Sequence, residues 1–313
     1  MAKFSVSEAA TAGFGLIGRE PLAVVGWTIV LLLSLGVTSL LLFLAMGPDL
    51  HRLIVLAMSH RSGAETDLSQ FREMAGLQSR MNALNMLFWL GASFVRAVLC
   101  AAVFRAILAP GQSAWAYLRV GSRELWLTLL LLVEQVLAMI AIVVIVLVLA
   151  VIVAIVAVSA GEGGKIAAAA TAVGGGVIAA GLLLWVALRL SMAAPMTFVD
   201  NQFRLFESWS LTKGQGWRLL GVGLLLAAFL IALELLIGGL VVALLFTGGA
   251  MTVMAAPGGL EAFLARPPIT VLRDLWPWIA AWATFGALFG AAAQAILYAP
   301  WAVIHRALTG EEA

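Results

Sequence analysis

The chain has 313 residues, of which 63% are hydrophobic and 11% are charged, and its mean hydropathy is +1.08. A soluble globular protein is about half apolar and about a quarter charged, so this composition excludes an ordinary soluble domain and indicates a membrane protein. The formal net charge of +2 is small, and the basic residues are scattered along the chain, which argues against nucleic-acid binding.

The sequence carries no recognisable catalytic or metal-binding motif. HExxH, CxxC and GxSxG are absent, and the single cysteine, Cys100, excludes an internal disulfide and a zinc site built from cysteines. We therefore expect no catalytic residue, no metal and no cofactor. The first apolar block starts after residue 20 and is about 25 residues long, so we expect a membrane span rather than a cleaved signal peptide.

Six apolar segments are long enough to cross a bilayer, and the sequence predicts a single all-α transmembrane domain over residues 1–313. A helix needs about 20 apolar residues to span the hydrocarbon core. The third segment has about 33 residues, or ~50 Å as one straight helix, so it must tilt, bend or protrude from a core ~30 Å thick. The predicted spans are residues 22–46, 84–104, 125–157, 166–188, 219–247 and 275–303.

The longest polar connection, residues 47–83, starts at Gly47-Pro48-Asp49, where we expect the first span to stop. Apolar residues recur at helical spacing within it, which predicts two amphipathic helices on the periplasmic membrane surface. A small cap packed on the helix bundle explains the same pattern equally well. The sequence leaves both interpretations open.

Small residues at four-residue spacing mark the fourth and sixth predicted spans. They include Gly175 and Gly176 in the fourth span, and Gly286 and Gly290 in the sixth. In lipid this spacing lets helix backbones approach closely. We therefore expect the fourth span to be a central, tightly packed helix.

Residues 203–218 interleave charged residues, aromatic residues and glycines between the fourth and fifth spans. This pattern predicts an interfacial helix and an elbow, with tryptophans at the membrane surface and basic side chains near anionic lipid headgroups. The predicted interface and headgroup residues are Arg204, Trp209, Lys213, Trp217 and Arg218.

Three connections of this kind, residues 5–20, 110–124 and 198–217, each precede two spans. They predict three helical hairpins, each preceded by a cytoplasmic interfacial amphipathic helix. A general need of multi-pass proteins for basic, aromatic elbows explains the same similarity without any repeat. Six spans place both termini on one side, and the greater number of basic residues there predicts cytoplasmic termini in the bacterial inner membrane.

Residues 117–125 (YLRVGSREL), 208–220 (SWSLTKGQGWRLL) and 299–308 (APWAVIHRAL) carry a resemblance to a known family. These blocks resemble recurring blocks of bacterial six-helix inner-membrane proteins of the YciC-like type, and of membrane domains attached to some glycerophosphodiester phosphodiesterases. The resemblance implies the fold. It does not imply the activity, because the chain has no segment for the soluble phosphodiesterase barrel of some relatives.

Three ionisable residues lie within predicted spans, where a charge costs at least ~3 kcal/mol: Arg96, Glu134 and Glu234. Counted along the helices, Arg96 and Glu134 lie ~14 and ~15 Å from the cytoplasmic end, so these two residues of adjacent antiparallel helices have matching depths. Glu234 lies deeper, at ~24 Å. We expect an intramembrane polar layer of these three residues completed by Gln294, in which an Arg96–Glu134 pair either fixes helix register or takes part in transport.

Two hypotheses for function follow from these features. The first is a non-enzymatic membrane protein that binds or organises membrane lipids or a partner, such as another membrane protein or a second copy of itself. The alternative is a transporter of a small solute or lipid that uses the Arg96–Glu134–Glu234 layer. A membrane enzyme acting on lipid is a third, minor interpretation, because it requires a polar cytoplasmic cavity that the sequence does not reveal.

Overall fold

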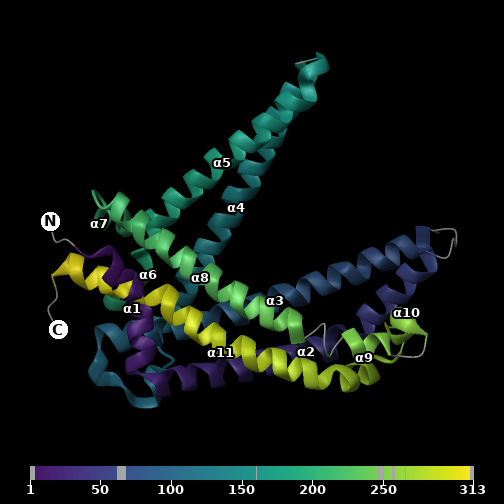
Figure 1. Ribbon diagram of the computed structural model, residues 1–313, viewed down its shortest axis with the longest axis horizontal. Helices are drawn as coiled ribbons and strands as arrows, with labels where there is room; N and C mark the ends of the chain where they lie inside the picture. Colours follow the sequence, from purple (N-terminus) through teal and green to yellow (C-terminus); the bar gives the residue numbers. More distant parts are fainter. Residues whose placement is uncertain are drawn as a thin grey trace.

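The computed structural model describes residues 4–61, 68–159, 161–244, 248, 250–255, 258–264 and 266–310 (Figure 1). About nine-tenths of the structure is helical, and the described residues contain no strand. The all-helical expectation is therefore confirmed. Residues 245–247 of the predicted fifth span and residues 62–67 of the long polar connection lie outside the described residues.

Six helices are long and apolar enough to cross a membrane, as expected of a multi-pass membrane protein. Each contains most or all of one predicted span. These helices are α2 (Pro21–Arg61), α3 (Leu68–Leu108), α4 (Ser122–Ser159), α5 (Gly164–Leu190), α8 (Gly216–Leu244) and α11 (Pro268–Thr309). The shorter elements are α1 (Val6–Arg19), η1 (Pro110–Gln112), η2 (Ala114–Tyr117), η3 (Gly161–Gly163), α6 (Ala193–Asp200), α7 (Glu207–Leu211), α9 (Ala250–Met254) and α10 (Gly259–Leu264).

Helix α11 lies at the centre of the helix packing. It contacts α1, α2, α3 and α8, and its alanines at four-residue spacing from Ala287 to Ala299 are fully or nearly fully buried. Helix α1 crosses it closely, since a Cβ added to Gly13 would lie 2.4 Å from the Cα of Ile296. Small side chains on both helices permit this approach. The start of α1 and the end of α11 lie near each other as a result (Figure 1).

Helices α4 and α5 pack on each other and extend away from the other long helices (Figure 1). We refer to their outer parts, residues 140–159 and 161–180, as the arm. Large apolar side chains of the arm are exposed, such as Val173 at 69% and Ile178 at 76%. The expectation that the fourth span is central is therefore wrong. Small residues bring α5 close to one neighbour, α4, and this spacing does not require burial on all sides.

The long polar connection also differs from expectation. Helix α2 does not stop at Gly47–Asp49 but continues through Pro48 to Arg61, and α3 already starts at Leu68. The amphipathic segments are thus continuations of the spanning helices rather than separate surface helices. A proline removes only one backbone hydrogen bond, which long membrane helices tolerate. Asp49 and Arg80 form an ion pair of 3.4 Å between the two extensions.

The connections expected to form interfacial helices adopt three different structures. Residues 5–20 form α1, whose start is capped by the Ser5 side chain, and α1 packs against α11 and α8. In residues 110–124, two 3-10 turns precede the start of α4 at Ser122, and no separate helix forms. Residues 198–217 contain the end of α6 and the short helix α7. The glycines and polar residues that break these segments into turns also shorten their helices.

Candidate functional site

A buried ion pair fixes the turn segment between α3 and α4. The Arg105 guanidinium donates to a Glu124 carboxylate oxygen and to the carbonyl oxygen of Tyr117, and the two side chains are only 3% and 2% exposed. The Trp27 indole nitrogen donates to the carbonyl oxygen of Ala116 at 2.9 Å. These bonds hold Trp115, Ala116 and Tyr117 in the left-handed region, with φ of 56°, 57° and 63°.

A cavity of about 690 Å³, here called the central cavity, lies on the inner side of α4 and α5. Its walls come from α3, α4, α5, α6, α11 and the α7 region. Most of the lining is aliphatic, and residues Leu131 to Ile145 of α4 extend along it for about 21 Å. Phe206, Trp209 and Trp301 contribute aromatic rings to the wall.

Three polar side chains face the central cavity from α3, α4 and α11, in addition to Ser191 at the end of α5. Arg96 of α3 donates from Nε to the Tyr298 hydroxyl of α11 at 2.7 Å, and its guanidinium lies 5.9 Å from the centre of that ring. Glu134 of α4 lines the same cavity. Within the part of the chain that the structure describes, Arg96 and Glu134 form no direct ion pair. Both side chains are therefore left with hydrogen-bonding capacity toward the cavity.

The structure brings together part of the predicted polar layer. Arg96 and Glu134 share the central cavity, whereas Glu234 is exposed on α8 and does not line it. Gln294 lies one helical turn before Tyr298, and its Oε1 atom is buried without a hydrogen-bond partner among the described residues. Tyr298 is absent from the predicted layer because its side chain carries no charge at neutral pH and therefore does not stand out among the apolar residues of a span. A signal was present, since this tyrosine follows Gln294 at a spacing that places both on one helix face.

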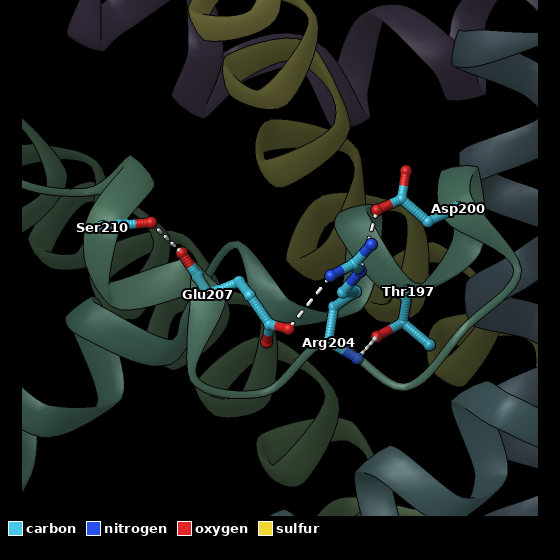
Figure 2. A network of polar contacts seen from close by, with 5 residues as sticks. All are labelled: Thr197, Asp200, Arg204, Glu207 and Ser210. Atoms are coloured by element: carbon cyan, nitrogen blue, oxygen red, sulfur yellow. Dashed lines mark hydrogen bonds and ion pairs between the residues drawn. The ribbon is translucent and has the colours of Figure 1, made fainter.

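Arg204, predicted to contact lipid headgroups, is bound within the chain (Figure 2). Its Nε donates to Asp200 and its Nη1 to Glu207, both at 3.1 Å, while its backbone N–H donates to the Thr197 hydroxyl. The backbone N–H of Glu207 and the Arg204 guanidinium together lower the pKa of the Glu207 carboxyl. The Ser210 hydroxyl donates to the Glu207 carbonyl oxygen at 2.7 Å and completes the network.

The other predicted interface residues differ in their surroundings. Trp209 packs edge to face on Trp185, with ring centres 5.0 Å apart. Trp217 is 88% exposed, Lys213 is exposed, and Arg218 is half-buried. Only Trp209 therefore belongs to a packed aromatic group.

The four glycines predicted to mediate helix packing divide into two pairs. A Cβ added to Gly175 would lie 2.4 Å from a methyl group of Leu149 on α4, and one added to Gly290 would lie 3.2 Å from Leu31 on α2. Cβ atoms added to Gly176 and Gly286 would have no neighbour within 4 Å. The first pair lies at helix contacts and the second pair at open surface.

The described residues contain no group of three His, Cys, Asp or Glu side chains able to hold a metal ion. Comparisons with protein-family models, with curated proteins and with solved structures gave no match to the chain. The central cavity, with its long apolar wall and its Arg96–Tyr298–Glu134 group, is the feature best suited to hold a ligand.

Proposed function

We propose that the protein binds a lipid-like amphiphile in the central cavity, with the polar part of the ligand at Arg96 and Tyr298 and its apolar chain along α4 and α5. The observation that carries this proposal is the combination of one long aliphatic wall with one small group of polar side chains. Its volume of about 690 Å³ is within the ~300–1,000 Å³ typical of small-molecule sites.

The unused hydrogen-bonding capacity of Arg96 and Glu134 favours ligand binding over a purely structural role. A guanidinium has five N–H groups, and Arg96 uses one of them, on Nε, for its single hydrogen bond within the described residues. A charge in the hydrocarbon core costs at least ~3 kcal/mol unless it is compensated. An acceptor group on an amphiphile compensates the Arg96 charge, and Glu134 opposite favours a ligand that also offers a donor.

We extend the proposal to the setting of the molecule. The protein lies in the bacterial inner membrane with its termini in the cytoplasm. It is related to the family that residues 117–125, 208–220 and 299–308 resemble. The neighbouring ends of α1 and α11 support termini on one side. We also propose the three-hairpin plan, supported by the contacts of α2 with α3, α4 with α5 and α8 with α11, with only the first hairpin preceded by a full helix, α1.

Filling the cavity tests the binding proposal. Ala141→Trp places an indole in the central cavity from α4, and Ala150→Trp makes the same change on an exposed part of α4 that does not line it. Native mass spectrometry of the proteins purified in mild detergent counts the bound lipid molecules. We expect A141W to lose one bound lipid, with affinity reduced roughly tenfold or more, and A150W to keep it. Unchanged lipid in a folded, monodisperse A141W would contradict the proposal.

Lipid transport is the second candidate, because Arg96 and Glu134 share the cavity at matching depth without a direct bond. The test is reconstitution into vesicles that contain a fluorescent phospholipid, followed by dithionite reduction of the outer leaflet. A carrier accelerates the loss of the protected inner fluorescence, and the double variant Arg96→Leu with Glu134→Leu abolishes that acceleration. A binding protein gives no acceleration in either form.

A further inference from the structure

A second cavity, of about 470 Å³, lies between α5 and α8. Here called the α5–α8 cavity, it meets α5 at residues 181, 184, 185, 188 and 189, whereas the central cavity meets it at residues 182, 183, 186, 187 and 190. The helical period places these two sets on different faces of α5. The two cavities are therefore separated by the width of one helix.

Among the described residues that line the α5–α8 cavity, Arg189 is the single charged one. Its guanidinium carbon lies 5.6 Å from the Trp185 ring centre and 5.7 Å from that of Trp209. The Nε and Nη1 atoms are buried and have no hydrogen-bond partner, and no carboxylate pairs with Arg189 among the described residues. The aromatic faces offset part of the positive charge of this half-buried side chain. The rest calls for an anion, since buried charges in proteins are paired and hydrogen-bonded.

The position of Arg189 is fixed by the chain around it. The Ser208 hydroxyl donates to the Arg189 carbonyl oxygen at 2.7 Å and accepts from the backbone N–H of Met192 at 3.1 Å. These bonds dock α7 onto the end of α5 and bring Trp209 against the guanidinium. The arrangement is a built site rather than an exposed basic side chain.

The location of the cavity indicates the kind of anion. Arg189 belongs to the last turn of α5, and Gly216 and Trp217 belong to the first turn of α8, so the polar end of the cavity lies where two membrane-spanning helices end. The amino-terminal end of α8 adds partial positive charge there. The remaining wall is apolar and includes Leu184, Leu188 and Leu220. A phosphate joined to an acyl chain matches this division of polar and apolar surface.

We infer that the α5–α8 cavity binds an anionic phospholipid, with the headgroup phosphate at the Arg189 guanidinium, which Trp185 and Trp209 hold in place, and an acyl chain along α5 and α8. Arginine suits this role because its planar guanidinium binds phosphate oxygens and stacks on aromatic rings. The site is independent of the ligand proposed for the central cavity.

The test measures binding of short-chain phosphatidylglycerol to detergent-purified protein by native mass spectrometry. Diacylglycerol of the same chain length lacks the phosphate, and inorganic phosphate lacks the chain. We expect phosphatidylglycerol to bind the wild type, diacylglycerol to bind at least roughly tenfold more weakly, and inorganic phosphate not to displace the phospholipid. Displacement by inorganic phosphate alone would assign the site to free phosphate and overturn the inference.

Variants locate the site. Arg189→Met removes the guanidinium, and Lys165→Met removes an exposed basic residue at the opposite end of α5 that does not line the cavity. We expect phosphatidylglycerol affinity to fall roughly tenfold in R189M and to stay at the wild-type level in K165M. Equal affinity in R189M and the wild type would overturn the inference.

A second pair of variants leaves Arg189 untouched. A Cβ added to Gly181 or to Gly176 has no neighbour within 4 Å, so the backbone of α5 accepts a side chain at either position. Gly181→Leu fills the α5–α8 cavity and should weaken phosphatidylglycerol binding, whereas Gly176→Leu should not. The central-cavity variant A141W should also bind phosphatidylglycerol here normally, so that the failure of one site proposal is distinguishable from the failure of the other. Full binding by G181L would count against the site.

Discussion

The arm and the pair formed by α3 and α11 show opposite relations between sequence and burial. The most apolar 18-residue stretch of the α4 span has no buried residue, whereas half of the corresponding stretch is buried in α3 and in α11, which are less apolar. Arg96, Arg105 and Tyr298 all lie on these less apolar helices. In lipid, the surface of a protein is as apolar as its interior, so high apolarity marks lipid contact, and small or polar side chains mark helix contact.

The largest loss of stability is expected from removing one partner of the buried Arg105–Glu124 ion pair. Glu124→Gln leaves Arg105 buried without its counter-charge, and we expect a loss of about 3–5 kcal/mol in the free energy of unfolding, since an unpaired buried charge is poorly solvated. Unfolding in detergent micelles, followed by circular dichroism, measures this loss. The double variant Arg105→Met with Glu124→Met should lose less than E124Q alone. A loss in E124Q below that of the double variant would show that the ion pair does not stabilise the interior.

An intermediate effect is expected from adding one methyl group in each region. Gly13→Ala pushes a Cβ to within 2.4 Å of the α11 backbone at Ile296, so we expect a loss of about 1–3 kcal/mol from overpacking. Gly176→Ala in the arm meets no atom within 4 Å and should be neutral or stabilising by up to about 1 kcal/mol, because alanine favours the helix. Thermal unfolding of both variants makes the comparison. Equal losses would show that the arm is packed as tightly as the α1–α11 contact.

The smallest effect on stability is expected from the Glu207 carboxyl, in the connection between α5 and α8. The folded-state pKa of Glu207 is lowered, so its contribution to stability is fully present above its unfolded pKa and is lost as the pH falls through the folded pKa. Because the network is solvent-exposed, the effect is small and weakens with salt. Unfolding temperatures from about pH 7 to about pH 3 should fall less steeply in Glu207→Gln than in the wild type, given a carboxyl pKa near 4.3 in the unfolded chain. Parallel curves would exclude a role for Glu207.

The membrane-spanning helices could be predicted from the sequence because length and apolarity are local properties of a segment. The proximity of Arg96 and Glu134 to one cavity could be predicted too, because the rise per residue of a helix is constant and adjacent spans run in opposite directions. The exposure of Glu234 was not, because the face that a helix turns toward its neighbours depends on the packing of the whole bundle. The same reason explains why the small residues of α5 were read as a sign of a central helix.

The Arg105–Glu124 pair could not be read from the sequence for a different reason. The two residues are separated by turns in which Trp115, Ala116 and Tyr117 adopt positive φ, a conformation that sequence rules assign to glycine or asparagine. Tertiary bonds from Arg105 and Trp27 impose it. The backbone preferences of these residues therefore gave no indication that α3 and α4 are joined by an ion pair here.

The alanine row of α11 has a consequence for how the chain tolerates changes in length. Inserting one residue into α11 between Ala291 and Ala295 rotates everything before the insertion by about 100° relative to everything after it. The buried alanines before and after the insertion would then face different directions, so they could no longer all contact α1 and α2. Tyr298 would no longer lie on the same face as the residues before the insertion. We therefore expect insertions to be tolerated in the segments between helices but not within α11, because the contacts of α1, α2, α3 and α8 all depend on the order of residues along it.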